Sequence, residues 1–214
     1  PDFQPVSTPI YSTVGYKYER MEDLDRIFGN EREGYVYARY GSPTNAALET
    51  ALAAMEEGEA ALTFGSGMAA VYASLLGAGV KNGASVVAAC DLYGATYAIC
   101  ARMLPDMGAR VKFVDVANLE ELGKTLAEVR PTAVILETIS NPLLKVADIP
   151  TVCRLAHRVG AQVIVDGTFT TPVLLQPLKH GADYSVHSTT KYIGGHGDVL
   201  GGAVITSREK RAKL

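Results

Sequence analysis

The sequence has no tryptophan, only three cysteines and no long run of apolar residues. The cysteines, Cys90, Cys100 and Cys153, stand in apolar surroundings and at spacings that fit neither a metal site nor a set of disulfides. We therefore expect reduced core residues and no bound metal. No segment approaches the length of a membrane span, and the start shows no apolar core of a secretory signal. These absences predict a cytoplasmic protein that does not enter membranes.

An excess of positive charge is also missing. The chain has 20 Lys and Arg residues against 23 Asp and Glu residues, a formal net charge of −3, and no basic run. A nucleic-acid partner is therefore not expected. With 48% hydrophobic and 20% charged residues, the 214 residues suffice for one sizeable core. Small-molecule chemistry is the function class that this composition leaves open.

Short apolar runs typical of strands alternate with helical segments along most of the chain. The predicted strands are 60–64, 85–90, 110–115, 132–136, 162–165, 184–187 and 201–206. Helices are expected at 46–57, from the turn at residues 65–70 onward, after residue 91, at 119–129 and at 149–159. Strands and helices that alternate with short turns predict an α/β fold with a mostly parallel, doubly wound sheet.

The first 40 residues differ from the rest, because they are polar, rich in aromatics and interrupted by prolines. We predict an extended N-terminal arm over residues 1–40 that lies against another surface, followed by the main domain over residues 41–214. Residues 35–39 alternate in polarity, so Tyr37 and Arg39 would project to one face if this run is extended.

A glycine-containing turn follows the first predicted strand. Gly65, Ser66, Gly67 and Met68 open a helix, where small residues let backbone N–H groups approach a phosphate. The same residues fit a dinucleotide-binding fingerprint, and Asp91 follows the next strand where a ribose-binding acid would stand. An NAD-binding dehydrogenase is therefore one hypothesis.

Two later residues favour a different cofactor. Asp166 ends a buried strand, and Lys191 follows the strand at 184–187 in a segment rich in hydroxyls and glycine. A carboxylate and a lysine at neighbouring strand ends are what pyridoxal 5′-phosphate (PLP) requires. The lysine attaches the cofactor and the acid keeps the pyridinium nitrogen protonated. The PLP hypothesis explains Asp166 and Lys191, which a dehydrogenase does not, and leaves only Asp91 without a role.

Residues 188–198 carry the pattern S-x-T-K-Y-x-x-G-H-x-D. This pattern resembles the lysine segment of the Cys/Met-metabolism (trans-sulfuration) family of fold-type I PLP enzymes. The resemblance covers nearly all 214 residues but only about the front half of a family member. It implies an aspartate-aminotransferase-like large domain, with the C-terminal domain and its carboxylate-binding arginine outside this chain. One departure is Gly167, where the family usually has an asparagine.

The resemblance also implies roles for individual residues. Lys191 and Tyr93 are expected to be catalytic, with the Tyr93 ring stacked on the cofactor and Asn141 beside its 3′-oxygen. Tyr37 and Arg39 are expected to hold the phosphate in a neighbouring subunit, which implies a homodimer or homotetramer with shared active sites. The expected cofactor-binding residues are Tyr37, Arg39, Ser66, Gly67, Met68, Tyr93, Asn141, Asp166, Ser188, Thr190 and Lys191.

The reaction implied is γ-replacement or γ-elimination on homoserine-derived or sulfur amino acids, as in cystathionine γ-synthases or O-acylhomoserine sulfhydrylases. A cystathionine lyase or a methionine γ-lyase is the alternative within the family. Ala95 stands where methionine γ-lyases often carry a cysteine, which weakly disfavours that activity. Outside the family, the alternatives are the NAD-binding dehydrogenase and a catalytically silent folding or interaction module.

Overall fold

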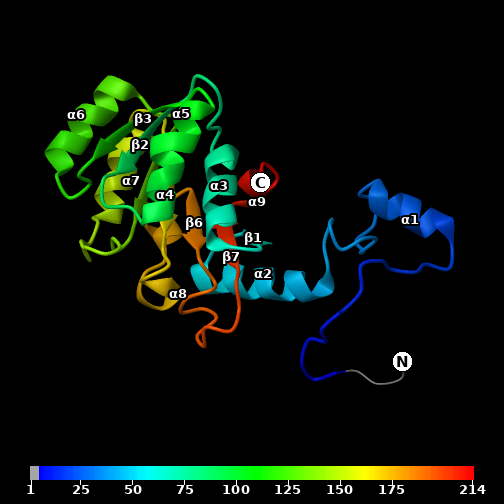
Figure 1. The fold of residues 1–214 in the computed structure, drawn as a ribbon. Coiled ribbons are helices and arrows are strands. Elements are labelled where there is room, and N and C mark those ends of the chain that lie inside the picture. The colour runs from blue at the N-terminus through cyan, green and yellow to red at the C-terminus, as the bar shows by residue number, and fades with distance from the viewer. Residues whose placement is uncertain (1–4) are drawn as a thin grey trace. The chain divides into compact units, whose positions relative to one another are not determined.

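The computed structural model describes residues 5–214 (Figure 1). The chain forms two compact units, one ending at Ala51 and the other spanning Leu52–Leu214. Helix α2 (Pro43–Glu56) contains the boundary between them. It begins three residues earlier than the sequence predicts, because Ser42 accepts a hydrogen bond from the Asn45 amide and Pro43 suits the first helical position. Within the described residues, no helix has the length and apolar character needed to cross a membrane.

The second unit is built on a seven-stranded sheet with the order β1-β7-β6-β5-β4-β2-β3. Neighbouring strands from β3 to β6 run parallel, whereas β7 is antiparallel to both β6 and β1. This arrangement confirms the predicted α/β class with a mostly parallel sheet. The strands are β1 (Ala60–Phe64), β2 (Ser85–Ala89), β3 (Arg110–Val114), β4 (Ala133–Glu137), β5 (Gln162–Asp166), β6 (Tyr184–His187) and β7 (Gly202–Thr206).

Helices pack around this sheet, and Figure 1 shows α3 to α7 beside it. Helix α3 contacts β6 and β7, while α6 and α7 contact each other and the strands β2, β3 and β5. Because the central strands are covered, β4 and β7 are buried along their whole length. The helices of this unit are α3 (Gly67–Gly77), α4 (Gly94–Ala98), the π-helical turn η1 (Ile99–Met103), α5 (Leu104–Asp106), α6 (Leu119–Val129), α7 (Ile149–His157), α8 (Thr171–Leu174), the 3₁₀ turn η2 (Pro177–His180) and α9 (Arg208–Arg211).

The first unit contains more regular structure than the sequence analysis expects. Helix α1 (Met21–Phe28) forms there, although none of its residues is buried. The extended run predicted for residues 35–39 is wrong beyond Tyr37, because the Tyr40 amide donates to the Tyr37 carbonyl at 2.9 Å and closes a turn. Tyr37 and Arg39 nevertheless lie together, since the guanidinium stacks 5.3 Å from the centre of the Tyr37 ring.

Candidate active site

A cleft of about 870 Å³ opens at the carboxyl ends of the parallel strands. The residues Glu137 and Asp166 end β4 and β5, and their Cα atoms are paired in the sheet register. Open α/β sheets bind ligands at this edge. All the predicted site residues of the second unit line this one cleft: Ser66, Gly67, Met68, Tyr93, Asn141, Asp166, Ser188, Thr190 and Lys191. Tyr37 and Arg39 belong to the first unit, and their expected role at the phosphate of a neighbouring subunit stays a prediction.

The start of α3 forms one wall of the cleft. Ser66 is the N-cap, and its hydroxyl accepts the Ala69 amide at 3.1 Å, so Gly67 and Met68 stand in the first turn of the helix. Amides of a first turn have no partner inside the helix and attract anions. A Cβ atom on Gly67 would lie 2.7 Å from Ser188 Cβ. Glycine is therefore required by the close approach of the two chain segments that line this wall.

The segment after β6 does not continue the strand. Strand conformation ends at His187, and a turn begins at Thr189, so the hydroxyls of Ser188 and Thr190 are not aligned by strand alternation. Thr190 Oγ1 instead donates to the Gly201 carbonyl at 3.1 Å and accepts the Gly201 amide at 2.9 Å. Thr190 still lines the cleft, but its hydroxyl joins the two ends of the glycine-rich loop.

Lys191 lies in this turn and lines the cleft. Its backbone amide donates to the Ser188 carbonyl at 3.1 Å, which fixes the start of the side chain. The residue is exposed in this chain. The physical reason is its place on a turn outside the sheet. Phe169 and Tyr192, whose rings lie 6.3 Å apart, also line the cleft and were not predicted.

Asp166 lies, as predicted, at the end of a buried strand, and its carboxylate is partly buried. Burial raises its pKa above the ordinary value, while the hydrogen bond from the Thr168 amide and the nearby His187 partly offset this. The Thr168 amide lies 2.9 Å from Oδ1. A partly buried carboxylate that has no bonded cation among the described residues is well suited to pair with a positively charged group of a ligand.

Behind Asp166 lies a buried polar group that sequence reasoning missed. The His187 imidazole is bonded to the Glu56 carboxylate, and both side chains are fully buried. Ser185 Oγ donates to Glu56 Oε1 at 3.1 Å. The edge of the imidazole lies against Gly167, where a Cβ atom would be 2.8 Å from Cε1. The ring therefore fills the space beside Gly167, which gives a local reason for the glycine at this departure from the family pattern.

Glu137 is a second carboxylate in the cleft and was also missed. Its Oε1 accepts the Tyr93 amide at 2.6 Å, and its Oε2 accepts the Asn141 amide at 3.0 Å. Burial raises the pKa of Glu137 to about 7; the charge of Asp166 acts in the same direction, and the two amide bonds oppose it. The signal that identified Asp166, an acid at the end of a buried strand, would also have found Glu137.

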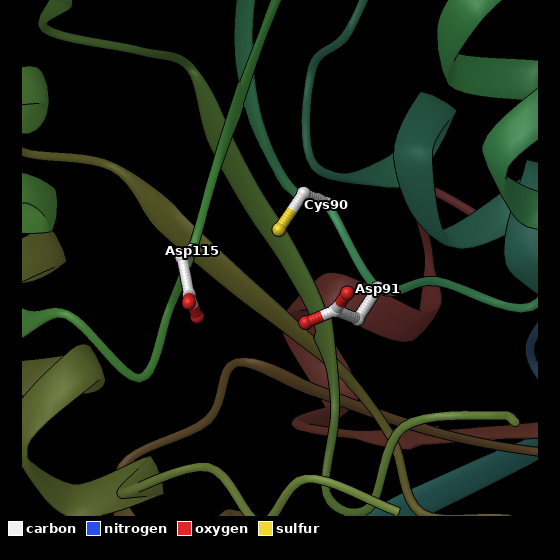
Figure 2. A group of neighbouring side chains, drawn as sticks. All are labelled: Cys90, Asp91 and Asp115. Atoms are coloured by element: carbon white, nitrogen blue, oxygen red, sulfur yellow. The ribbon is translucent and has the colours of Figure 1, made fainter. Parts of the chain in front are cut away.

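Asp91 belongs to a different cluster. Figure 2 shows Cys90, Asp91 and Asp115 with their side chains turned toward a common region, close enough to hold a metal ion. Lys145 Nζ, however, lies 2.7 Å from Asp91 Oδ2 and 3.5 Å from Asp115 Oδ2. The lysine supplies the positive charge that these acids need. Asp91 is thus engaged in an ion pair, which accounts for the residue that the PLP hypothesis left without a role.

Fold and cleft together define an α/β protein with a ligand site at the carboxyl edge of a parallel sheet, lined by a carboxylate, a lysine and a helix N-terminus. The family model for Cys/Met metabolism PLP-dependent enzymes matches residues 1–214, and the chain belongs to this family. The predicted family is confirmed, and the NAD-binding alternative is wrong.

Known proteins with similar sequences carry several activities. An L-methionine gamma-lyase of Fusobacterium nucleatum subsp. polymorphum is 45% identical over 205 residues, which are 95% of this chain and 51% of that protein. An O-succinylhomoserine sulfhydrylase of Mycobacterium tuberculosis (strain ATCC 25618 / H37Rv) is 41% identical over 207 residues, 97% of this chain and 50% of the relative. The chain therefore spans about half the length of these curated relatives.

A similar solved structure comes from Campylobacter jejuni, a protein proposed to be an O-acetylhomoserine (thiol)-lyase. It superposes with a TM-score of 0.89 at 33% identity, over 98% of this chain and 51% of that protein, and it contains N′-pyridoxyl-lysine-5′-monophosphate. PLP is thus the cofactor of the family. The residues here fit it, because the cleft provides a lysine, a buried acid and a helix start opened by Gly67.

Proposed function

We propose that the protein containing this chain is a PLP-dependent enzyme that performs γ-replacement or γ-elimination on homoserine-derived or sulfur amino acids. The observation that carries the proposal is the single cleft that joins Lys191, Asp166, Tyr93, Asn141 and the start of α3. Relatives named as synthases, sulfhydrylases and lyases of these amino acids support it. Elimination from methionine or cystathionine is the second candidate, favoured by the 45% identity to a methionine γ-lyase despite Ala95.

PLP, when bound, withdraws electrons from the substrate α-carbon and so allows a proton to leave it. In the proposed site, the Lys191 amine would hold the cofactor and would move protons between the substrate's α- and γ-positions. The Asp166 carboxylate keeps a proton on the ring nitrogen. Tyr93 would lie against the cofactor ring and handle the leaving-group proton, while Asn141 would bind the 3′-oxygen.

The phosphate is proposed to bind the amides of Gly67 and Met68 at the start of α3, where the helix dipole favours an anion. Ser66, Ser188 and Thr190 line the same wall. Ser188 lies directly beside Gly67, because a Cβ atom built on Gly67 would be 2.7 Å from Ser188 Cβ. The Thr190 hydroxyl, occupied by Gly201, would act through the loop it closes.

Lys191→Ala tests the proposal in the full-length protein. The parent should be yellow, with a visible absorption band that borohydride abolishes. It should convert its amino-acid substrate to an α-keto acid, ammonia and the γ-leaving group or, when a thiol is added, to a thioether with loss of the γ-leaving group. The variant should lose both the band and turnover. Lys124→Ala, which removes an exposed lysine that pairs with Glu120 on α6, is the matched control. A Lys191→Ala protein that retained the reducible band would refute the assignment.

Tyr37 and Arg39 are proposed to complete the phosphate site of a partner subunit in a cytoplasmic homodimer or homotetramer. A planar, permanently charged guanidinium suits a phosphate dianion. Mixing Arg39→Ala and Lys191→Ala proteins, each inactive alone, under subunit exchange should restore part of the activity, because a hybrid dimer contains one intact site. No recovery despite proven exchange would show that each site is made within one chain.

A further inference from the structure

Glu137 occupies a central place at the edge of the sheet. It ends β4, which lies between β2 and β5, and its residue is only 8% exposed. Tyr93 follows β2, Asn141 follows β4, and Asp166 ends β5. Glu137 therefore stands between the segments that carry three of the predicted cofactor-binding residues.

The contacts of Glu137 join two of these segments. Each carboxylate oxygen accepts one backbone amide, from Tyr93 at 2.6 Å and from Asn141 at 3.0 Å. An ionised carboxylate is purely an acceptor and has room for both donors. Since the two oxygens belong to one planar group, the two amides are held at a fixed separation. Tyr93 has no side-chain cap bond of its own at the start of α4, so this carboxylate is an anchor for that residue.

The carboxylate is kept in this position against an electrostatic penalty. Burial and the neighbouring Asp166 both raise the pKa of Glu137, and only the two amide bonds lower it. Within the described part of the chain, no lysine or arginine is among the groups that shift its pKa. Among the described residues, the hydrogen bonds given for the Glu137 side chain are those from the amides of two cleft residues, so its contacts point to the cleft.

We propose that Glu137 is a positioning residue that sets the spacing between Tyr93 and Asn141 across the cofactor ring. The inference rests on the proposed function of those two residues in PLP binding. The Glu137 side chain acts through the two backbones. Its loss would let the ring-covering tyrosine and the 3′-oxygen partner move independently. Small misplacements of such groups lower the efficiency of a site strongly.

Two variants of the full-length protein separate positioning from folding. Glu137→Gln keeps the shape but has one acceptor oxygen for two amides, and Glu137→Ala has none. In the apoprotein, amide hydrogen exchange followed by mass spectrometry should show faster exchange for peptides containing Tyr93 or Asn141. At least one of the two should change in the glutamine variant, and both in the alanine variant if it folds. The exposed Glu128→Gln on α6 is the control and should change neither.

PLP binding supplies the second readout. The dissociation constant, followed through the visible band, should rise about tenfold in Glu137→Gln and remain unchanged in Glu128→Gln. Faster exchange combined with weaker binding supports the proposal. Unchanged exchange at both amides in Glu137→Gln would overturn the anchor, and faster exchange with unchanged PLP binding would overturn its positioning role. A parent protein that binds no PLP would instead refute the proposed function, while the exchange of the two amides would still decide whether Glu137 holds them.

Discussion

Two carboxylates at opposite edges of the same sheet show how this fold separates stability from chemistry. Asp183 precedes β6 at its amino end and is bonded to Lys210 at 2.6 Å and His157 at 2.9 Å, and to the Val163 amide. Asp166 ends β5 at the carboxyl edge and has the Thr168 amide as its bonded partner. Burial acts to raise the pKa of both carboxylates. The hydrogen-bond partners of Asp183 outweigh this and lower its pKa, whereas the pKa of Asp166 stays raised.

The acid that is bonded to cationic side chains of the chain, Asp183, lies outside the cleft. The acids without such a bonded partner, Asp166 and Glu137, line it. At the amino edge, charge is matched within the protein. At the carboxyl edge, Asp166 and Glu137 keep raised pKa values and face an open cleft. Glu56 also has bonded partners within the protein, although one of them, His187, ends β6 at the carboxyl edge: its buried carboxylate is bonded to His187 and Ser185. Replacing an acid that is bonded to a partner within the protein should therefore lower the free energy of unfolding. Replacing Asp166 or Glu137 should mainly weaken ligand binding.

The largest loss of stability is expected for Glu56→Ala. This change leaves His187 Nε2 and Ser185 Oγ buried without their carboxylate partner and opens a cavity. Breaking such a buried pair costs about 3–5 kcal/mol. Urea unfolding of the apoprotein measures it, with Glu120→Ala as the control, since that residue forms an exposed ion pair with Lys124. The control should change stability by less than about 1 kcal/mol. Equal losses in the two variants would remove the distinction between buried and exposed acids.

Sequence reasoning found most of the fold because its signals are local. Strands β1 and β6 and helix α6 have the predicted bounds, since apolar runs and their limits are written in consecutive residues. Asp166 and Lys191 were found because strand ends of a parallel sheet meet at one edge. The bond between Glu56 and His187 joins residues 131 positions apart, so no local sequence pattern predicts it. The bond between the Thr190 hydroxyl and Gly201 was not predicted for the same reason, because it closes a loop.

Asp183→Asn should cause a smaller loss, about 2 kcal/mol at neutral pH, because asparagine has no negative charge to pair with Lys210 and only one acceptor oxygen where Asp183 uses two. The pKa of Asp183 is lowered by folding, so its stabilisation is fully present above the ordinary value of 3.8 and is lost as the pH falls through the lower folded value. The difference in unfolding free energy between parent and variant should therefore shrink below pH 3.8. A difference that stayed constant through this range would show that the charge of Asp183 is not what stabilises the fold.

The smallest effect on stability is expected for Asp166→Asn, although its effect on the cofactor should be large. Folding raises the pKa of Asp166, so the ionised carboxylate becomes less favourable in the folded state as the pH rises above the ordinary value of 3.8. Replacing it with a neutral amide should therefore leave the stability of the apoprotein at neutral pH within about 0.5 kcal/mol of the parent, or raise it.

The same replacement removes the negative charge proposed to face the protonated ring nitrogen, an interaction on the order of a few kcal/mol. PLP should then be lost on dialysis, and exchange of the substrate α-proton with solvent should nearly stop. Asp166→Glu keeps the charge on a longer side chain and should retain part of both. If Asp166→Asn destabilised the apoprotein as much as Asp183→Asn and kept its PLP, Asp166 would belong with the matched acids. Asp166 and Asp183 would then both act on stability, and the raised pKa of Asp166 would not indicate a ligand site.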